Sequence, residues 1–186
     1  MNVVITGHTR GIGRALTDEF QTNGHSVAGY SKSTGFDISI ANCRQTILDN
    51  AVDADIFINN AFDPIGQYEL LEGMIAVWEG TDKLIINLSS KGALVSNITN
   101  PVINAYCRSK EQQNNLLRSR ILGSSPRVLN VVVGLVDTEL STQWPFAKID
   151  PADLAALIYQ LTVSPIMVQE IVLDVHGFDW RNFQQA

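Results

Sequence analysis

The sequence TGHTRGIG at residues 6–13 is the segment that decides the fold. It follows a short apolar run, NVVIT at residues 2–6, and it leads into a helix-like stretch at residues 11–21. The glycines Gly7, Gly11 and Gly13 allow a sharp turn from strand to helix, and they let the backbone approach a ligand where a Cβ atom would intrude. The N–H groups that open the next helix attract phosphate. A tight turn without a ligand is the alternative, but this position between a first strand and a first helix favours a phosphate-binding loop.

Five further short apolar runs follow along the chain, and none alternates strictly between apolar and polar residues. They lie at residues 26–30, 55–59, 84–88, 128–133 and 171–175. Such runs are typical of strands buried on both faces of a parallel sheet. Helix-like stretches separate them, at residues 39–52, 68–78 and 105–122 and again from Asp150-Pro151, where the aspartate is a helix cap and the proline suits the first turn. The alternation predicts one α/β domain over residues 1–186, a three-layer sandwich around a parallel sheet with right-handed crossovers.

Composition excludes several classes of protein. The chain has 186 residues, a net charge of -6, 45% apolar residues and 17% charged residues, which is too apolar for a disordered chain. Without a basic cluster, we expect neither nucleic acid nor a membrane surface as partner. No apolar run is long enough to span a bilayer, and no signal peptide is evident. The two cysteines form no CxxC pair and the histidines share no metal-ligand spacing, so we expect no metal and a cytoplasmic protein.

The glycine spacing Gly-x-x-x-Gly-x-Gly resembles that of the short-chain dehydrogenases/reductases, and four later segments match that family in the same order. They are Asn59-Asn60-Ala61, Asn87-Leu88-Ser89-Ser90, the YxxxK segment from Tyr106 to Lys110, and the segment from Gly134 to Thr138. The resemblance covers nearly the whole chain. It implies a Rossmann-type doubly wound parallel sheet of about seven strands, a small-molecule carbonyl or alcohol substrate, and a homo-oligomer, either a dimer or a tetramer.

The resemblance also implies a nicotinamide cofactor, and the residues favour NADP over NAD. After the second strand, an acidic residue would accept a hydrogen bond from the ribose of NAD, but here Ser31 and Lys32 stand at that point. Lys32 and Arg10 are cations that can pair with the extra phosphate of NADP. In full, the implied cofactor contacts are Gly7, Thr9, Arg10, Gly11, Ile12, Gly13, Ser31, Lys32, Asp37, Ile38, Asn60, Ala61, Tyr106, Lys110, Gly134, Val136 and Thr138.

The catalytic residues implied by the resemblance are Ser90, Tyr106 and Lys110. Tyr106 and Lys110 are four residues apart on a predicted helix and so face the same way. A nearby ammonium would lower the pKa of the tyrosine and suit it to act as general acid in reduction and general base in oxidation. Ser90 would hydrogen-bond the substrate oxygen, with Ser89 as the rival for that role. An amphipathic helix face without chemistry is the alternative for the tyrosine and lysine.

The chain also departs from the family. Phe62 stands where the family has glycine, and too few residues lie between Lys32 and Asp37 for the usual helix, so we expect a bare loop there. No asparagine occurs from residue 62 to 86 to supply the family's proton relay. Water and backbone, or another group such as Gln67, would have to replace it, or turnover would be poor. The sequence therefore leaves open an NADP-dependent oxidoreductase and an impaired NADP(H)-binding sensor or regulatory protein. If no nicotinamide cofactor binds, a structural α/β module whose surface binds protein is the third function.

Overall fold

The structure is a computed structural model, and it describes residues 1–95, 100–120 and 125–175. Its centre is a parallel sheet with the strand order β2-β1-β3-β4-β5-β6. The strands are β1 (Asn2–Thr6), β2 (Ser26–Tyr30), β3 (Ile56–Asn59), β4 (Leu84–Ser90), β5 (Arg127–Val133) and β6 (Glu170–Leu173). The helices are α1 (Gly11–Thr22), α2 (Ala41–Ala51), α3 (Gly66–Val77), α4 (Pro101–Arg118) and α5 (Pro151–Val163). The predicted Rossmann-type fold class is confirmed.

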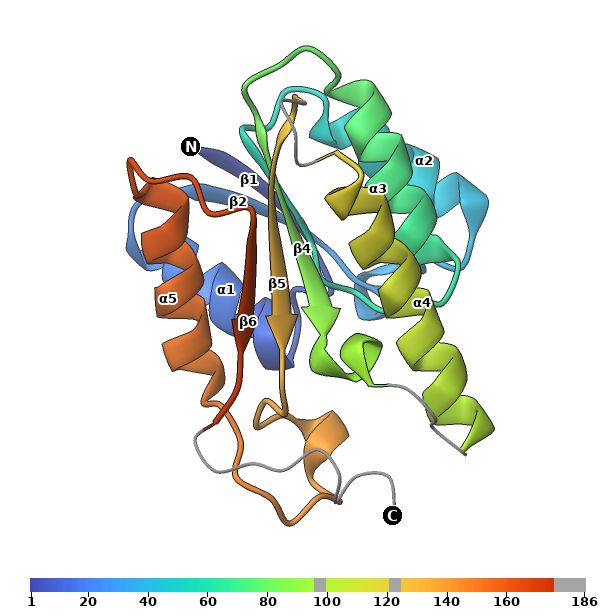
Figure 1. Ribbon diagram of the computed structural model, residues 1–186. Helices are drawn as coiled ribbons and strands as arrows, with labels where there is room; N and C mark the ends of the chain where they lie inside the picture. Colours follow the sequence, from blue (N-terminus) through green and yellow to red (C-terminus); the bar gives the residue numbers. More distant parts are fainter. Residues whose placement is uncertain (96–99, 121–124, 176–186) are drawn as a thin grey trace.

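The helices form two layers, one on each face of the sheet (Figure 1). Helices α1 and α5 cover one face, and α2, α3 and α4 cover the other. Side chains that alternate along each strand feed the two cores: Ile86 packs in the cluster with Leu16 of α1, and Ile85 packs in the cluster with Leu70 of α3. Both faces of the central strands are therefore buried, which explains why their sequences are apolar without alternation.

The described part of the sheet has six strands rather than about seven. The connection from β2 to α2 contains a short 3-10 helix, Lys32–Thr34, and then a loop through Gly35, which has a φ of 91°. This segment is too short to add a strand and its crossover helix, which needs a dozen or more residues. It is also more ordered than the bare loop that the sequence predicts, because Ser31 and Thr34 form a reciprocal capping box.

Helix starts follow local capping more closely than apolar periodicity. Helix α4 begins at Pro101, before the predicted residue 105, because Asn100 accepts hydrogen bonds from the backbone N–H groups of Val102 and Ile103. Helix α5 begins as predicted, with Asp150 as its cap. Helix α2 begins later than predicted, because Ser39 donates to Asp37 instead of capping the helix. No helix in the described residues is long and apolar enough to cross a membrane.

The sheet changes direction between β1 and β3. From β1 the chain goes to β2 on one side, and every later strand is added on the other side. In open α/β sheets, ligands bind at such a switch point, beyond the carboxyl ends of the strands. The two loops at this point are joined: the backbone N–H groups of Asn60 and Ala61 each donate to Thr6 Oγ1 at 3.0 Å, and Asn60 Nδ2 donates to Thr6 O at 2.9 Å.

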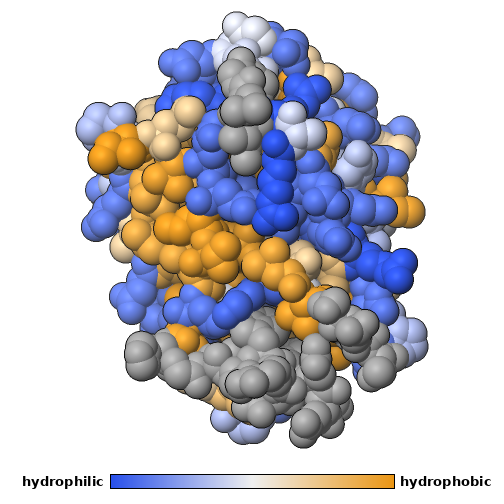
Figure 2. Space-filling model, viewed as in Figure 1, coloured by the Kyte–Doolittle hydropathy of each residue, from blue (hydrophilic) through white to orange (hydrophobic). Residues whose placement is uncertain are grey.

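Figure 2 shows an apolar area on the face that Figure 1 presents, where α5, β5 and β6 are drawn. Strand β6 forms one edge of the described sheet, and Val172 on it is 48% exposed. Val163, Ile166 and Met167 near the end of α5 are also exposed. An apolar edge strand of this kind is a surface suited to association with another chain.

Candidate active site

The phosphate loop has the shape that its glycines predict. Gly7 and Gly11 have positive φ angles of 74° and 54°, in the region that favours glycine. A Cβ atom on Gly13 would lie 2.1 Å from Gly7 O and 2.5 Å from Asn60 Nδ2, so no larger residue fits there without a backbone shift. Helix α1 starts here without a side-chain cap, whereas Asn100 and Asp150 cap α4 and α5. The loop therefore offers an uncapped helix start to an anionic group.

The segment after β5 lies against this loop. Thr138 Cγ2 is 3.2 Å from the position that a Cβ atom on Gly11 would occupy, and Arg10 forms a 3.4 Å ion pair with Glu139. Val136 is buried in the core beneath. Gly134 is packed closely against Asp174, which would lie 2.3 Å from a Cβ atom at position 134. The structure thus brings the two glycine segments that the sequence singles out to one end of the sheet.

The side chains at the end of β2 are linked to the phosphate loop. Ser31 Oγ lies 2.9 Å from His8 Nδ1, and Thr9 Oγ1 lies 3.0 Å from Ser33 Oγ. His8 also occupies the space beside Gly29, where a Cβ atom would come within 2.2 Å of its ring. The link between His8 and Ser31 is not evident from the sequence, because nothing in the spacing of the two residues pairs them.

Lys32 and Asp37 form an exposed 2.7 Å ion pair at the same place. Hydrogen bonds from Lys32 and Ser39 lower the pKa of Asp37 to about 2, so this carboxyl is ionised at neutral pH. Ile38 is buried in the core, with 5% of its surface exposed, which leaves little of the side chain to contact an adenine ring. Of the predicted adenosine contacts, Lys32 and Asp37 are therefore better placed than Ile38.

Ser90 and Tyr106 are brought together at the end of β4. Their side chains are hydrogen-bonded, and Ser90 Oγ also accepts from the backbone N–H of Gly92 at 3.1 Å. Ser89 alternates to the other side of the strand, where its hydroxyl is buried and has no hydrogen-bond partner in the described residues. The geometry favours Ser90 over Ser89 as the serine that acts with Tyr106.

Lys110 lies one helical turn after Tyr106 and is buried, with 3% of its surface exposed. Its Nζ atom donates to Gln67 Oε1 at 2.6 Å and to Leu88 O at 2.7 Å, and it lies 5.8 Å from the centre of the Tyr106 ring. Burial lowers the pKa of Lys110 to about 7, because the charged form has lost most of its hydration. Gln67 is therefore the side chain that contacts Lys110 in a chain without the expected relay asparagine.

The pKa of Tyr106 is raised above its usual value, and not lowered as the sequence predicts. Burial is the main cause, and the hydrogen bond with Ser90 opposes it. The prediction is wrong because the loss of hydration around the buried phenol outweighs the effect of a nearby ammonium on this pKa. Phe62 adds to this apolar wall, since its ring centre lies 4.8 Å from that of Tyr106. Near neutral pH, Tyr106 is thus a protonated phenol that can donate a proton.

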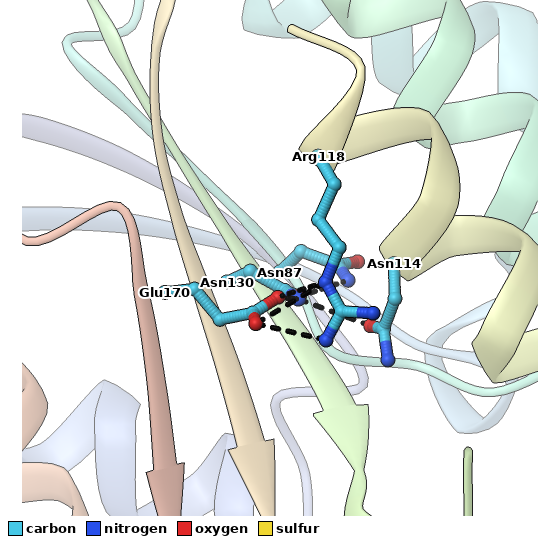
Figure 3. Close-up of polar contacts among 5 residues, drawn as sticks. All are labelled: Asn87, Asn114, Arg118, Asn130 and Glu170. Carbon is cyan, nitrogen blue, oxygen red and sulfur yellow. Dashed lines mark hydrogen bonds and ion pairs between the residues drawn. The ribbon is translucent and has the colours of Figure 1, made fainter. Parts of the chain in front are cut away.

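A ladder of buried amides crosses the sheet below the site (Figure 3). Asn59, Asn87 and Asn130 are register partners on β3, β4 and β5, and each donates to the next element: Asn59 Nδ2 to Asn87 Oδ1 at 3.1 Å, and Asn87 Nδ2 to Asn130 Oδ1 at 3.0 Å. Figure 3 shows the ladder from Asn87 onward. Asn130 Nδ2 then donates to Asn114 of α4 and to Glu170 of β6. The ladder is not among the predicted features, although an asparagine in each of the apolar runs 55–59, 84–88 and 128–133 is a signal for it.

Glu170 ends the ladder and carries an ion pair. Arg118, the last residue of α4, donates to both carboxylate oxygens of Glu170 at 2.9 to 3.2 Å. The hydrogen bonds from Arg118 and Asn130 outweigh partial burial and keep the pKa of Glu170 below its usual value. Helix α4 is therefore attached to the sheet by polar contacts at Lys110, Asn114 and Arg118. No group of three or more His, Cys, Asp or Glu side chains in the described ranges is placed to hold a metal ion.

No family model matches this sequence, and no curated protein matches it. Solved structures do match its fold. A 3-alpha-hydroxysteroid dehydrogenase from a Pseudomonas species, complexed with NADH, aligns with a TM-score of 0.77 and 19% identity over 94% of this chain and 95% of that one. A short chain dehydrogenase from Burkholderia cenocepacia, in complex with NADP, gives 0.76 and 19% over 94% and 88%. An alcohol dehydrogenase from Thermococcus sibiricus, complexed with 5-hydroxy-NADP, gives 0.72 and 19% over 92% and 95%.

Proposed function

We propose that this chain, which has the fold of the short-chain dehydrogenases/reductases, is an NADP-dependent oxidoreductase that interconverts a carbonyl and an alcohol on a small molecule. The observation that carries this proposal is the joint placement of Ser90, Tyr106 and Lys110 at the carboxyl end of β4. The glycine loop after β1 suits a dinucleotide phosphate, because Gly7 and Gly11 have positive φ angles and helix α1 begins there without a side-chain cap.

The chain's own groups have distinct roles in this chemistry. Bound NADPH would supply the hydride. Tyr106 donates a proton to the carbonyl oxygen in reduction and accepts a proton in oxidation. Because its raised pKa keeps the phenol protonated at neutral pH, Tyr106 is ready to act as the acid in reduction. When substrate binds, Ser90 gives up its hydrogen bond with Tyr106 and donates instead to the same substrate oxygen, where negative charge develops. Lys110 has one N–H group left beyond its two described acceptors, and this group holds the cofactor ribose.

The test combines binding and turnover. We expect NADPH to raise the melting temperature, by a stabilisation of about 2.7 kcal/mol when its concentration is about 100 times Kd. We also expect NADPH oxidation with at least one member of a panel of ketones and aldehydes. Stabilisation without turnover on the panel would instead support the sensor or regulatory protein that the missing relay asparagine suggests. No stabilisation by NADP(H) or NAD(H) would contradict both functions.

The preference for NADP rests on Arg10 and Lys32. Both are exposed, and their ion pairs with Glu139 and Asp37 are of the weak surface kind, so a dianionic phosphate can displace these partners. We expect the double variant Arg10→Ala/Lys32→Ala to bind NADPH about 10- to 100-fold more weakly and NADH unchanged, since the lost charge-assisted contacts concern one phosphate. Isothermal titration with both cofactors measures this difference.

The control for this pair is Arg120→Ala, which removes a surface arginine that pairs with Glu79 beyond the end of α4. It should bind both cofactors as the wild type does. Equal weakening of NADPH and NADH in the double variant would show that Arg10 and Lys32 contact something other than the extra phosphate, and the preference for NADP would then be wrong.

We also propose that copies of the chain associate and that the protein works in a reducing compartment such as the cytoplasm. The apolar edge formed by β6 supports the first point, because an edge strand with an exposed apolar side chain, here Val172, favours pairing. The free cysteines Cys43 and Cys107 support the second. Light scattering on the purified protein measures its mass in solution, and the mass of a single chain would contradict association.

A further inference from the structure

The side chain of Gln67 is wholly buried at the start of α3, and every part of its amide is engaged. Nε2 donates to Asn59 O at 3.0 Å and to Leu88 O at 3.2 Å, which are backbone carbonyls of β3 and β4. Because both N–H groups are bound to carbonyl oxygens, the amide has one orientation, with Oε1 turned the other way. Oε1 accepts from Lys110 Nζ at 2.6 Å and from Gln113 Nε2 at 3.3 Å.

Lys110 Nζ has two described hydrogen-bond acceptors, so the contact with Gln67 is important for the buried amine. Gln67 faces it from α3, Leu88 O from β4, and the rings of Phe62 and Tyr106 lie 5.3 and 5.8 Å from its Nζ atom. No carboxylate forms an ion pair with Lys110 among the residues the structure describes. The titratable neighbour on its own helix is Tyr106, which is neutral near pH 7. Two neutral oxygen atoms therefore hold the buried ammonium, and Gln67 supplies the one that belongs to a side chain.

We infer that Gln67 is the positioning residue of this site: its amide oxygen holds the ammonium of Lys110 in place and favours the charged form of the amine. Through Lys110, Gln67 acts on Tyr106 and on the cofactor ribose without touching either. Gln67 thus supplies a side-chain amide in the segment from residue 62 to 86, which contains no asparagine to serve as the relay group. It rests on the proposed function for its effect on turnover, but not for its effect on the lysine.

Three variants separate this role from a general structural one. Gln67→Met keeps a similar volume and removes the acceptor, so the charged form of Lys110 loses support. Gln67→Glu places a carboxylate against the ammonium and supports the charged form more strongly. Gln113→Met is the matched control, because Gln113 is also a buried glutamine and contacts Gln67 but has no described contact with Lys110.

The first measurement needs neither cofactor nor substrate. The free energy of unfolding is determined by urea denaturation across a pH series, and the Lys110→Met variant identifies the part of the pH dependence that comes from this lysine. We expect the titration midpoint of Lys110 to move to lower pH in Gln67→Met and to higher pH in Gln67→Glu. In Gln113→Met it should stay at the wild-type position. An unmoved midpoint in both Gln67 variants would overturn the inference.

The second measurement is kinetic. With an active carbonyl substrate, we expect kcat of Gln67→Met to fall by about 10- to 100-fold, the range for losing one hydrogen bond to a charged group. The upper limb of the pH profile should shift in the same directions as the midpoints, with little change in Gln113→Met. Equal losses in Gln67→Met and Gln113→Met with unshifted profiles would also overturn the inference. If the wild type has no turnover, the proposed enzyme fails, and the denaturation series still decides the role of Gln67.

Discussion

The variant Tyr106→Phe is expected to reduce carbonyl substrates with a kcat about 10²- to 10⁴-fold below that of the wild type, the contribution of a positioned general acid. Phenylalanine keeps the ring and its contact with Phe62, whose centre is 4.8 Å away, and removes the hydroxyl that is hydrogen-bonded to Ser90. Packing and the cofactor cradle should therefore persist. The measurement is NADPH oxidation under saturating substrate, together with thermal stabilisation by NADPH.

Tyr68→Phe is the control for this prediction. Tyr68 lies on α3, where its hydroxyl contacts Glu72 on the same helix, so the same atom is removed from a tyrosine outside the site. It should keep wild-type turnover. The decisive combination is retained NADPH binding with lost turnover in Tyr106→Phe alone. Equal rates in Tyr106→Phe and the wild type would mean that another group transfers the proton, and the proposed mechanism would be wrong.

The second large effect concerns stability and its dependence on pH. The pKa of Lys110 is lowered from 10.5 to about 7 by burial. Between these two values the unfolded chain binds more protons than the folded one, so the free energy of unfolding rises with pH in this window. As pH falls toward 7, folding must bury an increasingly charged amine, and this part of the stability is lost. The slope from this one group approaches about 1.4 kcal/mol per pH unit. Lys110→Met should lack this slope and should be more stable than the wild type near pH 7.

Urea denaturation at intervals across this window measures the prediction. Lys83→Met is the control, since Lys83 lies at the surface beside the ring of Trp78, and its variant should keep the wild-type dependence on pH. Parallel curves for the wild type and Lys110→Met would show that the lysine titrates in the folded protein as it does in the unfolded one. That result would contradict the conclusion that burial lowers the pKa of Lys110.

The sequence predicted the parts of the protein that depend on neighbours along the chain. The phosphate loop follows from three glycines between one strand and one helix, and the start of α5 follows from Asp150 and Pro151. The start of α4 lies four residues before the predicted residue 105, although Asn100 and Pro101 are as clear a signal. Local capping is readable when it is sought, because cap and helix lie within four residues of each other.

Contacts between distant segments were not predictable in the same way. Gln67 was only one of several candidates for the missing relay group, because its distance from Lys110 depends on how α3 and α4 pack on β4. The pKa of Tyr106 was predicted in the wrong direction, because burial outweighs the nearby amine and burial is a property of the folded site. The sequence shows which groups are present, while packing decides which influence on each group is larger.

The buried asparagines have a consequence for how the sheet assembles. Asn59, Asn87 and Asn130 are paired only when β3, β4 and β5 lie in their observed register. Apolar strands such as these have nearly the same burial energy after a slip along one another, so hydrophobicity alone selects the alignment weakly. A slip would leave amides buried without partners, at a cost of about 1 to 3 kcal/mol for each. The amides thus disfavour sheets with a shifted register, and through Asn114 they fix the height at which α4 holds Tyr106 and Lys110 against the sheet.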